Sequence, residues 1–499
     1  MPAEDRKRLV VPFHQDQSHP SGSTGENQLA GAYETSLGKT RYSPSVRELV
    51  RRNLRFFVIV SLAALALRLF FVLRFPGVVT DSFIYGDIAK NWLEHGIYGL
   101  SGTDGISPTY IRLPGYPAFL AFIFAIFGMD HYRAALVVQV FADLGTCFLC
   151  ADIARRLFGL RSAKLALVLA ALCPFLADYS AAALTETLEI FFTALALDLA
   201  ATAFQNGRNR YWAGCGASCG AAMLLRPDGA LLVMAIAAFV GIRVLRQWHA
   251  PNRFRQIQAA FLLVAIAALP LVPWIVRNWY VFQRFQPLAP RYANEEDEFV
   301  PMGFNHWTKS WIADYVSVEE IYWAVPGSKI DAANLPPRAF DAPQQRQETE
   351  QLITDYNNLL HISPPLDARF EAISAERIQA HPIRYYLGLP VLRILDMWLR
   401  PRTETLPCDS RWWEFNDEPK WSAVAIGFGA LNLAYLLCAM VGGLKFRAAA
   451  IIGMMFLFVI LRSAFLGTLE NPEPRYTLEM YPVVIVLAAA AFVRRENLL

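Results

Sequence analysis

Charged residues are scarce in this chain of 499 residues: only 18% are Asp, Glu, Lys or Arg, whereas 55% are hydrophobic. The mean hydropathy is +0.29. Length alone would suggest about three soluble domains, but several apolar runs reach the roughly 20 residues that cross a bilayer. The composition therefore excludes a soluble protein and predicts an all-α fold, a polytopic bundle of transmembrane helices.

Excess charge of one sign is also missing. The formal net charge is +3, which gives no case for a nucleic-acid partner. Of the seven cysteines, six lie in apolar segments, where cysteine usually acts as a small hydrophobic residue. Cys147 and Cys150 form a CxxC pair, but on a predicted membrane helix, so neither a disulfide nor a zinc site is expected. No HExxH motif is present, and the histidines outside the apolar runs are interpreted as surface residues. We predict no cofactor and no metal ligands, with a divalent ion between carboxylates as the alternative.

A signal peptide is not expected either. The first long apolar run begins near Phe56, directly behind Arg51, Arg52 and Arg55. These arginines predict a cytoplasmic N-terminus, because positive charges flank the cytoplasmic ends of membrane helices. Residues 1–50 are rich in Ser, Gly, Gln and charge, and are predicted to be a disordered cytoplasmic tail.

The apolar runs and the basic loops between them predict about ten membrane spans. We expect them near residues 56–74, 132–153, 163–178, 184–204, 211–224, 229–244, 257–276, 421–441, 448–466 and 481–493. Two further apolar segments, 116–128 and 383–399, are expected to lie at the interface. If they cross instead, the number of spans rises to twelve.

This topology divides the chain into four parts. They are the tail at 1–50, a catalytic transmembrane module at 51–280 with a first outer loop at 76–131, an extracytoplasmic segment at 281–420 that contains the interfacial helix, and a C-terminal transmembrane module at 421–499. The predicted location is the plasma or inner membrane, with any site on the extracytoplasmic face.

Several polar residues are predicted to lie together on that outer face. They are Asp81, Arg112, Glu186, Arg226, Arg277, Arg475 and Tyr476. A single arginine at such a position is more often an interfacial anchor, but charged groups near the bilayer are costly and mark functional sites. The arginine fork matches phosphate, and a nearby carboxylate can accept a proton from an attacking hydroxyl or amine. The set therefore suggests group transfer from a lipid phosphate.

The same residues lie in motifs that resemble the GT-C superfamily of polytopic glycosyltransferases. Within it, the similarity is to the protein-mannosyltransferase and aminoarabinose-transferase branch. The motifs, in order, are "DSFIYGDIAKNWLEHG", "RLPGYPAFLAFIFAIFG", "ARRLFG", "LTETLEIFF", "LLRPDGALL", "PWIVRNW" and "PEPRYTLEMYP". One departure is that Ser82, and not glutamate, follows Asp81. The longer soluble domain of the protein O-mannosyltransferases is also not expected in this chain, which argues against a protein mannosyltransferase.

This resemblance implies specific roles. The donor would be a polyprenyl-phosphate-linked sugar and the acceptor a lipid, glycan or protein, in contact with membrane lipid. Asp81 would be the catalytic base or would orient the acceptor, and Glu186 would help to bind acceptor or sugar. The expected substrate-binding residues, with the arginines on the donor phosphate, are Tyr85, Arg112, Arg226, Arg277, Arg475 and Tyr476.

Two other functions fit a polytopic protein with intramembrane charge. A secondary transporter is one, although transporters often contain an internal repeat and none is evident between the two halves. A non-catalytic assembly or sensor protein, with the 281–420 segment as a partner-binding face, is the other.

Overall fold

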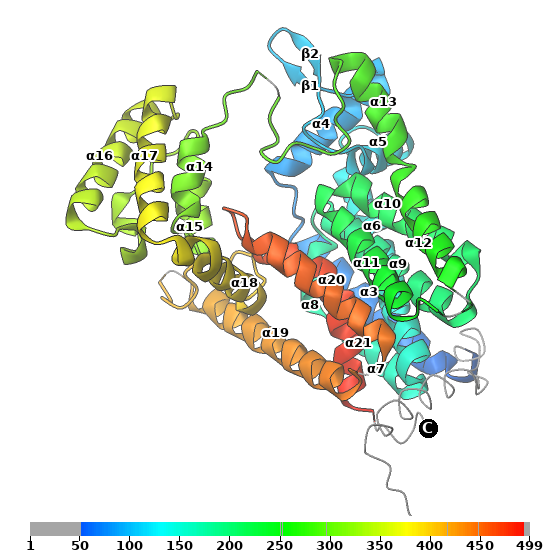
Figure 1. The fold of residues 1–499 in the computed structure, drawn as a ribbon. Helices are drawn as coiled ribbons and strands as arrows, with labels where there is room; N and C mark the ends of the chain where they lie inside the picture. The colour runs from blue at the N-terminus through cyan, green and yellow to red at the C-terminus, as the bar shows by residue number, and fades with distance from the viewer. Residues whose placement is uncertain are drawn as a thin grey trace, which may run out of the picture.

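A computed structural model describes residues 51–493 except Ala250, Asn252, Glu296, Asp417 and Ala448. The predicted tail at 1–50 lies outside the described residues, as do residues 494–499. Most of the described chain is helical, in agreement with the predicted fold class. Figure 1 shows a long helical body and a smaller helical unit, α14–α17, beside it.

Each of the ten predicted spans coincides with a helix. They are α3 (Leu54–Arg74), α6 (Tyr132–Phe158), α7 (Leu160–Ala171) with α8 (Pro174–Tyr179), α9 (Glu186–Asn206), α10 (Asn209–Leu225), α11 (Ala230–Arg246), α12 (Arg253–Ala268) with α13 (Leu271–Phe282), α19 (Pro419–Lys445), α20 (Ala450–Gly467) and α21 (Tyr481–Ala491).

Length decides which of these helices can cross a bilayer unaided. In the described residues, α3, α6, α9, α11 with the preceding turn Pro227–Gly229, α19 and α20 are long and apolar enough. The pair α12 and α13, bent by 43°, would make a seventh span. Because α7, α10 and α21 are shorter, the number of ten crossings stays a prediction.

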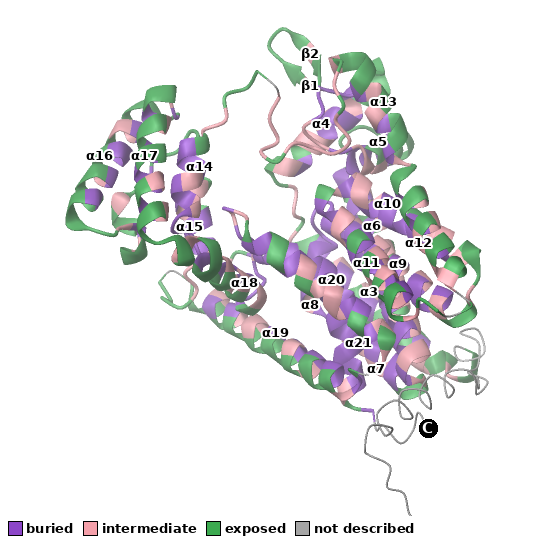
Figure 2. Cartoon of the chain, in the orientation of Figure 1, coloured by how far each residue is buried: buried purple, intermediate pink, exposed green. Residues whose placement is uncertain are grey.

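Helix α21 lies in the middle of the body. All residues from Tyr481 to Ala490 are buried, as the continuous purple in Figure 2 shows. Helix α19 packs closely against α21 because Gly442 has no side chain: an added Cβ there would collide with the carbonyl oxygen of Leu487.

Residues 76–131, the predicted first outer loop, contain a helix, a hairpin and a second helix. Helix α4 (Thr80–His95) contains Asp81 in its first turn, and it ends at Gly96 in the left-handed conformation (φ 70°). The short strands β1 (Gly99–Gly102) and β2 (Gly105–Pro108) pair antiparallel, and helix α5 (Gly115–Phe127) follows. At 13 residues, α5 is too short to cross a bilayer.

The segment at 281–420 has a hydrophobic core of its own. It contains α14 (Met302–Lys309), α15 (Tyr315–Ser317), a π-helical turn (Val318–Tyr322), two short turns (Ala332–Asn334, Pro337–Ala339), α16 (Pro343–Leu359) and α17 (Pro364–Ala380). Trp307, Trp311 and Phe370 lie fully buried in its centre. A buried arginine, Arg377, donates hydrogen bonds to the carbonyl oxygens of Arg338 and Ala339, both at 2.8 Å.

Helix α18 (Leu389–Leu399), preceded by the π-helical turn Arg384–Gly388, joins this unit to α19 and α20. Across residues 383–399, exposed apolar side chains recur every four residues, at Ile383, Leu387, Val391, Leu395 and Leu399. Such an apolar stripe is typical of a helix that lies at a membrane surface, as predicted for 383–399.

A buried ion pair ties the first span to its neighbours. Arg68 of α3 is fully buried, and its Nε donates a hydrogen bond to Asp143 Oδ2 of α6 at 2.6 Å. Its Nη1 and Nη2 donate to the carbonyl oxygens of Ala171 and Ala170, at the end of α7. One side chain therefore holds three helices together.

Removal of one partner of this pair should cost more than removal of both. We expect Asp143→Leu to lower the free energy of unfolding by about 3–5 kcal/mol, because it leaves a buried guanidinium without its carboxylate. The double variant Arg68→Met/Asp143→Leu should recover part of that loss. Thermal unfolding of the purified protein in detergent micelles measures both, and a double variant less stable than the single one would contradict the expectation.

Candidate active site

The segments that lead to the two predicted carboxylates are joined by an isolated parallel β-bridge. The N–H of Gly77 donates to the carbonyl oxygen of Ala181, and the N–H of Ala183 donates to that of Gly77, both at 2.8 Å. An added Cβ on Gly77 would lie 3.2 Å from the Cα and Cβ of Ala182, so the two strands approach closely only because residue 77 is glycine. Asp81 follows Gly77 by four residues, and Glu186 follows Ala182 by four.

Asp81 lies in the first turn of α4, where the helix dipole favours a carboxylate. Its side chain is 35% exposed. Arg112 Nη2 donates a hydrogen bond to Oδ1 at 3.0 Å, and Arg475 Nη2 lies 3.9 Å from Oδ2. Asp81 is thus an accessible carboxylate between two guanidinium groups.

Glu186 is the first residue of α9, and its side chain is only 2% exposed. Its Oε1 accepts a hydrogen bond from Arg226 Nη1 at 3.2 Å and lies 3.5 Å from Arg475 Nη1. Its Oε2 is buried without a hydrogen-bond partner among the described residues. Arg475 therefore contacts both predicted carboxylates and joins them into one cluster.

The segment before α21 supplies Arg475 and Tyr476. Arg475 Nε lies 2.6 Å from Glu473 Oε2, and the Tyr476 hydroxyl donates to the same carboxylate. The guanidinium of Arg226 lies 4.6 Å from the centre of the Tyr476 ring, a cation–π contact. Burial lowers the pKa of Arg475, but Glu473 and Glu186 outweigh this effect and hold the pKa well above its usual range.

Tyr85 and Arg112 form the other side of the cluster. The ring of Tyr85 packs edge-on against Tyr116 with 5.1 Å between centroids, and the guanidinium carbon of Arg112 lies 5.9 Å from the Tyr85 centroid. Burial raises the pKa of Tyr85 to about 12, so its hydroxyl stays protonated at neutral pH. Arg112 Nε has no hydrogen-bond partner among the described residues.

Of the four predicted arginines, Arg277 is the one for which the described residues show no ion pair with Asp81 or Glu186. From α13, its Nη1 donates to the carbonyl oxygen of Thr109 and its Nη2 to that of Tyr98, both at 2.7 Å. Arg277 therefore anchors the two residues that flank the β1–β2 hairpin. One of them, Thr109, lies three residues before Arg112. Its role on a donor phosphate stays a prediction.

A second, deeper cluster lies around Arg462 of α20, whose side chain is 1% exposed. Arg462 lies 2.8 Å from Asp228 Oδ2, 3.2 Å from Glu479 Oε2 and 3.3 Å from Glu189 Oε1. Arg226 also reaches Glu189, at 3.6 Å, and so connects the two clusters. Sequence reasoning did not assign these four residues to the site, although an arginine inside the apolar run 448–466 is itself a signal.

The three carboxylates around Arg462 are close in sequence to the residues above them. Glu189 lies one helical turn after Glu186, Asp228 two residues after Arg226, and Glu479 four residues after Arg475. The buried guanidinium thereby fixes three elements that carry the predicted site residues.

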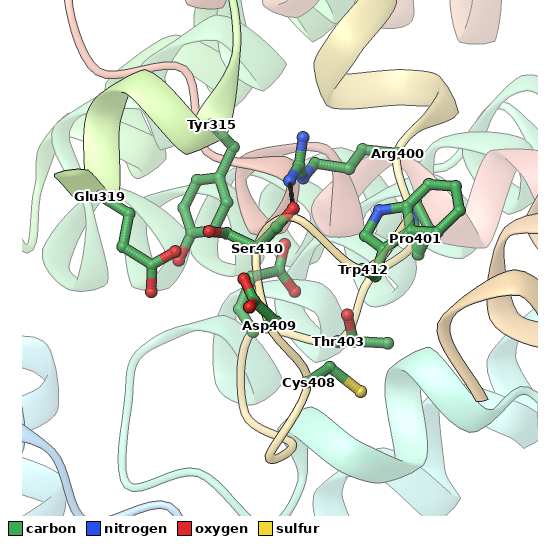
Figure 3. Close-up of a pocket in the computed structure, with 10 residues that line it drawn as sticks. Tyr315, Glu319, Arg400, Pro401, Thr403, Cys408, Asp409, Ser410 and Trp412 are labelled. Atoms are coloured by element: carbon green, nitrogen blue, oxygen red, sulfur yellow. Dashed lines mark hydrogen bonds between the residues drawn. The ribbon is translucent and has the colours of Figure 1, made fainter. Parts of the chain in front are cut away.

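Figure 3 shows a small polar pocket. The Tyr179 hydroxyl donates to Glu404 Oε2 at 3.1 Å, and Glu404 lines the pocket with Tyr315, Glu319, Arg400 and Trp412 among others. Figure 3 shows the hydrogen bond that Arg400 donates to the carbonyl oxygen of Ser410. None of the residues predicted from sequence lines this pocket.

No group of three His, Cys, Asp or Glu side chains suited to a metal ion occurs within the part of the chain that the structure describes. Independence from metal stays a prediction.

Residues 109–276 match the family model described as dolichyl-phosphate-mannose-protein mannosyltransferase, which covers about a third of the chain. The match contains Arg112, Glu186 and Arg226, begins after Asp81 and ends just before Arg277. It confirms the resemblance to the protein-mannosyltransferase branch that the motifs predict. No curated protein matches the chain in sequence.

Two solved structures of membrane enzymes are similar over most of the chain at low identity. The oligosaccharyltransferase AglB from Archaeoglobus fulgidus, in complex with an inhibitory peptide and a dolichol-phosphate, is 15% identical, with a TM-score of 0.48; the similarity covers 88% of this chain and 50% of AglB. ArnT from Cupriavidus metallidurans, bound to undecaprenyl phosphate, is 14% identical, with a TM-score of 0.38 and coverage of 87% and 78%. The chain therefore spans about half the length of AglB.

The deep cluster should be essential for stability. We expect Arg462→Met to lower the free energy of unfolding by about 3–5 kcal/mol, because it removes the cation that three buried carboxylates share and leaves Glu479 without an ion pair among the described residues. Arg462→Lys should lose less, since it keeps the charge.

The matched control is Arg346→Met, which removes an exposed arginine that pairs with Glu350 in the same helix. Such a pair contributes about 0.5 kcal/mol or less. Equal losses for the Met variants of Arg462 and Arg346, measured by thermal unfolding in detergent, would show that the deep cluster does not hold the elements together.

Proposed function

We propose that the chain is an integral-membrane glycosyltransferase. It transfers a sugar from a polyprenyl-phosphate donor to a lipid, glycan or protein acceptor on the extracytoplasmic face. The family-model match over residues 109–276 supports the reaction class, and its description names a sugar carried on a dolichyl phosphate. The match includes two of the arginines and one of the carboxylates of the cluster.

The observation that carries the proposal is the position of Asp81. It is the accessible carboxylate of the cluster, flanked by Arg112 and Arg475, and Arg475 also contacts the buried Glu186. A base, a second carboxylate and phosphate-binding groups thus lie within a few ångströms of each other, on elements far apart in the sequence.

This arrangement suits a displacement at the anomeric carbon. The acceptor hydroxyl or amine attacks that carbon and passes its proton to the Asp81 carboxylate. The bond from the anomeric carbon to the phosphate oxygen breaks, and its electron pair leaves with the lipid phosphate. Arg112, Arg226 and Arg475 stabilise the charge that develops there.

The arginines can serve both partners because a guanidinium group has five N–H donors. Arg112 gives one donor to Asp81 and another to the Ile111 carbonyl oxygen, and its Nε is unpaired. Arg277 would first have to release the Tyr98 and Thr109 carbonyls. The reaction needs no metal in this scheme, since the guanidinium groups supply the positive charge.

Glu186 is assigned to the acceptor or the sugar. Its free Oε2 can accept a hydrogen bond from a hydroxyl group, while Oε1 stays with Arg226 and Arg475. Tyr85 and Tyr476 complete the binding surface as the aromatic walls beside Arg112 and Arg226.

The substitution Asp81→Asn should lower kcat by about 10²–10⁴-fold, the usual contribution of a general base, and leave the amount of folded protein unchanged. Asp104→Asn, in the exposed turn of the β1–β2 hairpin, is the matched control and should keep full activity. Mass spectrometry of lipid-linked sugars and surface glycans, with and without the protein, identifies the substrates for this assay. Full activity of Asp81→Asn would remove Asp81 from the chemistry.

The proposal also fixes the side of the membrane. Ten crossings from a cytoplasmic N-terminus place the hairpin outside and the α6–α7 junction inside. A cysteine at Thr103 should therefore react with a membrane-impermeant maleimide added to intact cells, and a cysteine at Arg161 should react only after permeabilisation. Both positions are exposed, and the parent chain reports the background of the native cysteines. Labelling of the Arg161 position in intact cells would refute the topology.

A further inference from the structure

Gln139 is a buried amide in the middle of α6 with no part in the chemistry described above. Its side chain is fully buried and forms three hydrogen bonds. Its Oε1 lies 2.7 Å from the Tyr116 hydroxyl of α5, and its Nε2 lies 2.6 Å and 3.4 Å from the carbonyl oxygens of Ala182 and Ser180.

The chemistry of these partners determines the orientation of the amide. A carbonyl oxygen only accepts hydrogen bonds, so the NH₂ group must face Ala182 and Ser180. The amide oxygen then faces Tyr116, whose hydroxyl must donate. Gln139 is therefore satisfied only while α5, α6 and the 180–183 segment keep their present positions.

The 180–183 segment leads to both predicted carboxylates. Ala182 is the residue opposite Gly77 in the parallel bridge, and this bridge lies four residues before Asp81 and four before Glu186. Only two backbone hydrogen bonds hold the bridge. The hydrogen bond from Gln139 to Ala182 fixes it to the rigid α6 helix.

A second connection runs from Gln139 to the arginine side of the site. Tyr116, held by the amide oxygen, packs against Tyr85, and Tyr85 lies beneath Arg112. Arg112 in turn donates its hydrogen bond to Asp81. One amide thus supports the backbone before each carboxylate and the aromatic stack below Arg112.

We propose that Gln139 is a positioning residue that fixes Asp81 and Glu186 relative to each other. The inference rests on the proposed glycosyl transfer for its kinetic consequence, but its geometric part is independent of any activity. A displacement of reacting groups by about 1 Å costs about 100-fold in rate. None of the three hydrogen bonds of Gln139 goes to a predicted site residue, so we expect its loss to affect the chemical step more than the affinity for the donor.

The kinetic test uses Gln139→Leu and Tyr116→Phe. We expect kcat to fall by about 10- to 100-fold in the first and by less in the second, which removes one hydroxyl and keeps the ring against Tyr85. The donor KM should stay within twofold of the parent. Thr146→Val is the matched control: Thr146 is also buried on α6, but its hydroxyl bonds within its own helix, to Ala142. Unchanged kcat in both variants would overturn the proposal. If Gln139→Leu fails to fold, Tyr116→Phe decides.

The geometric test is a disulfide across the bridge. Cβ atoms at positions 77 and 182 would lie 3.2 Å apart, slightly closer than the about 3.5–4.5 Å typical of disulfides, so a disulfide forms after the two segments move apart by a few tenths of an ångström. We expect the double variant Gly77→Cys/Ala182→Cys to form a disulfide on oxidation. Gln139→Leu should slow the formation of this disulfide at least several-fold, and Thr146→Val should leave its rate unchanged. An unchanged oxidation rate would overturn the proposal.

The two tests separate the possible failures. No transfer by the parent chain, combined with a slower disulfide in Gln139→Leu, would reject the proposed function and keep the positioning role. Transfer by the parent chain, with kcat and disulfide formation unaltered in Gln139→Leu, would reject the positioning role alone.

Discussion

A single guanidinium group, that of Arg462, holds together three elements that reach the candidate site from different parts of the chain. Its ion pairs with Glu189, Asp228 and Glu479 are buried, so each carboxylate depends on it for compensation in a poorly solvated environment. Residues within one turn of those carboxylates form the layer above, where Arg475 bridges Asp81 and Glu186.

Much of this site can be predicted from sequence, because charge beside an apolar run is rare and costly. That rule identifies Asp81, Glu186, Arg226 and Arg475, and the structure brings all four together. It cannot say which charges pair, since the partners are separated by up to several hundred residues. Arg462 illustrates this limit. The sequence shows a costly charge inside an apolar run, but it does not show the three carboxylates that pair with this charge.

The fold shows the same division. The long apolar runs predict the helices because length and hydropathy are local properties, and all ten ranges coincide with helices. The β1–β2 hairpin is missed because four-residue strands give too little alternation to detect. The core around Trp307 and Trp311 is predicted only as a region, because it forms from short elements joined by irregular turns.

The bridge between Gly77 and Ala182 bears on how the protein is made. It joins residues 105 positions apart. The deep cluster is complete only after Glu479 has been synthesised. During synthesis, Glu189 and Asp228 enter the membrane region long before Arg462 exists to neutralise them. Until α20 and α21 are inserted, Arg226 is the guanidinium group within ion-pair distance of those two carboxylates. The candidate site is thus complete only after α20, α21 and the segment between them are in place, because Arg462 and Arg475 both come from this part of the chain.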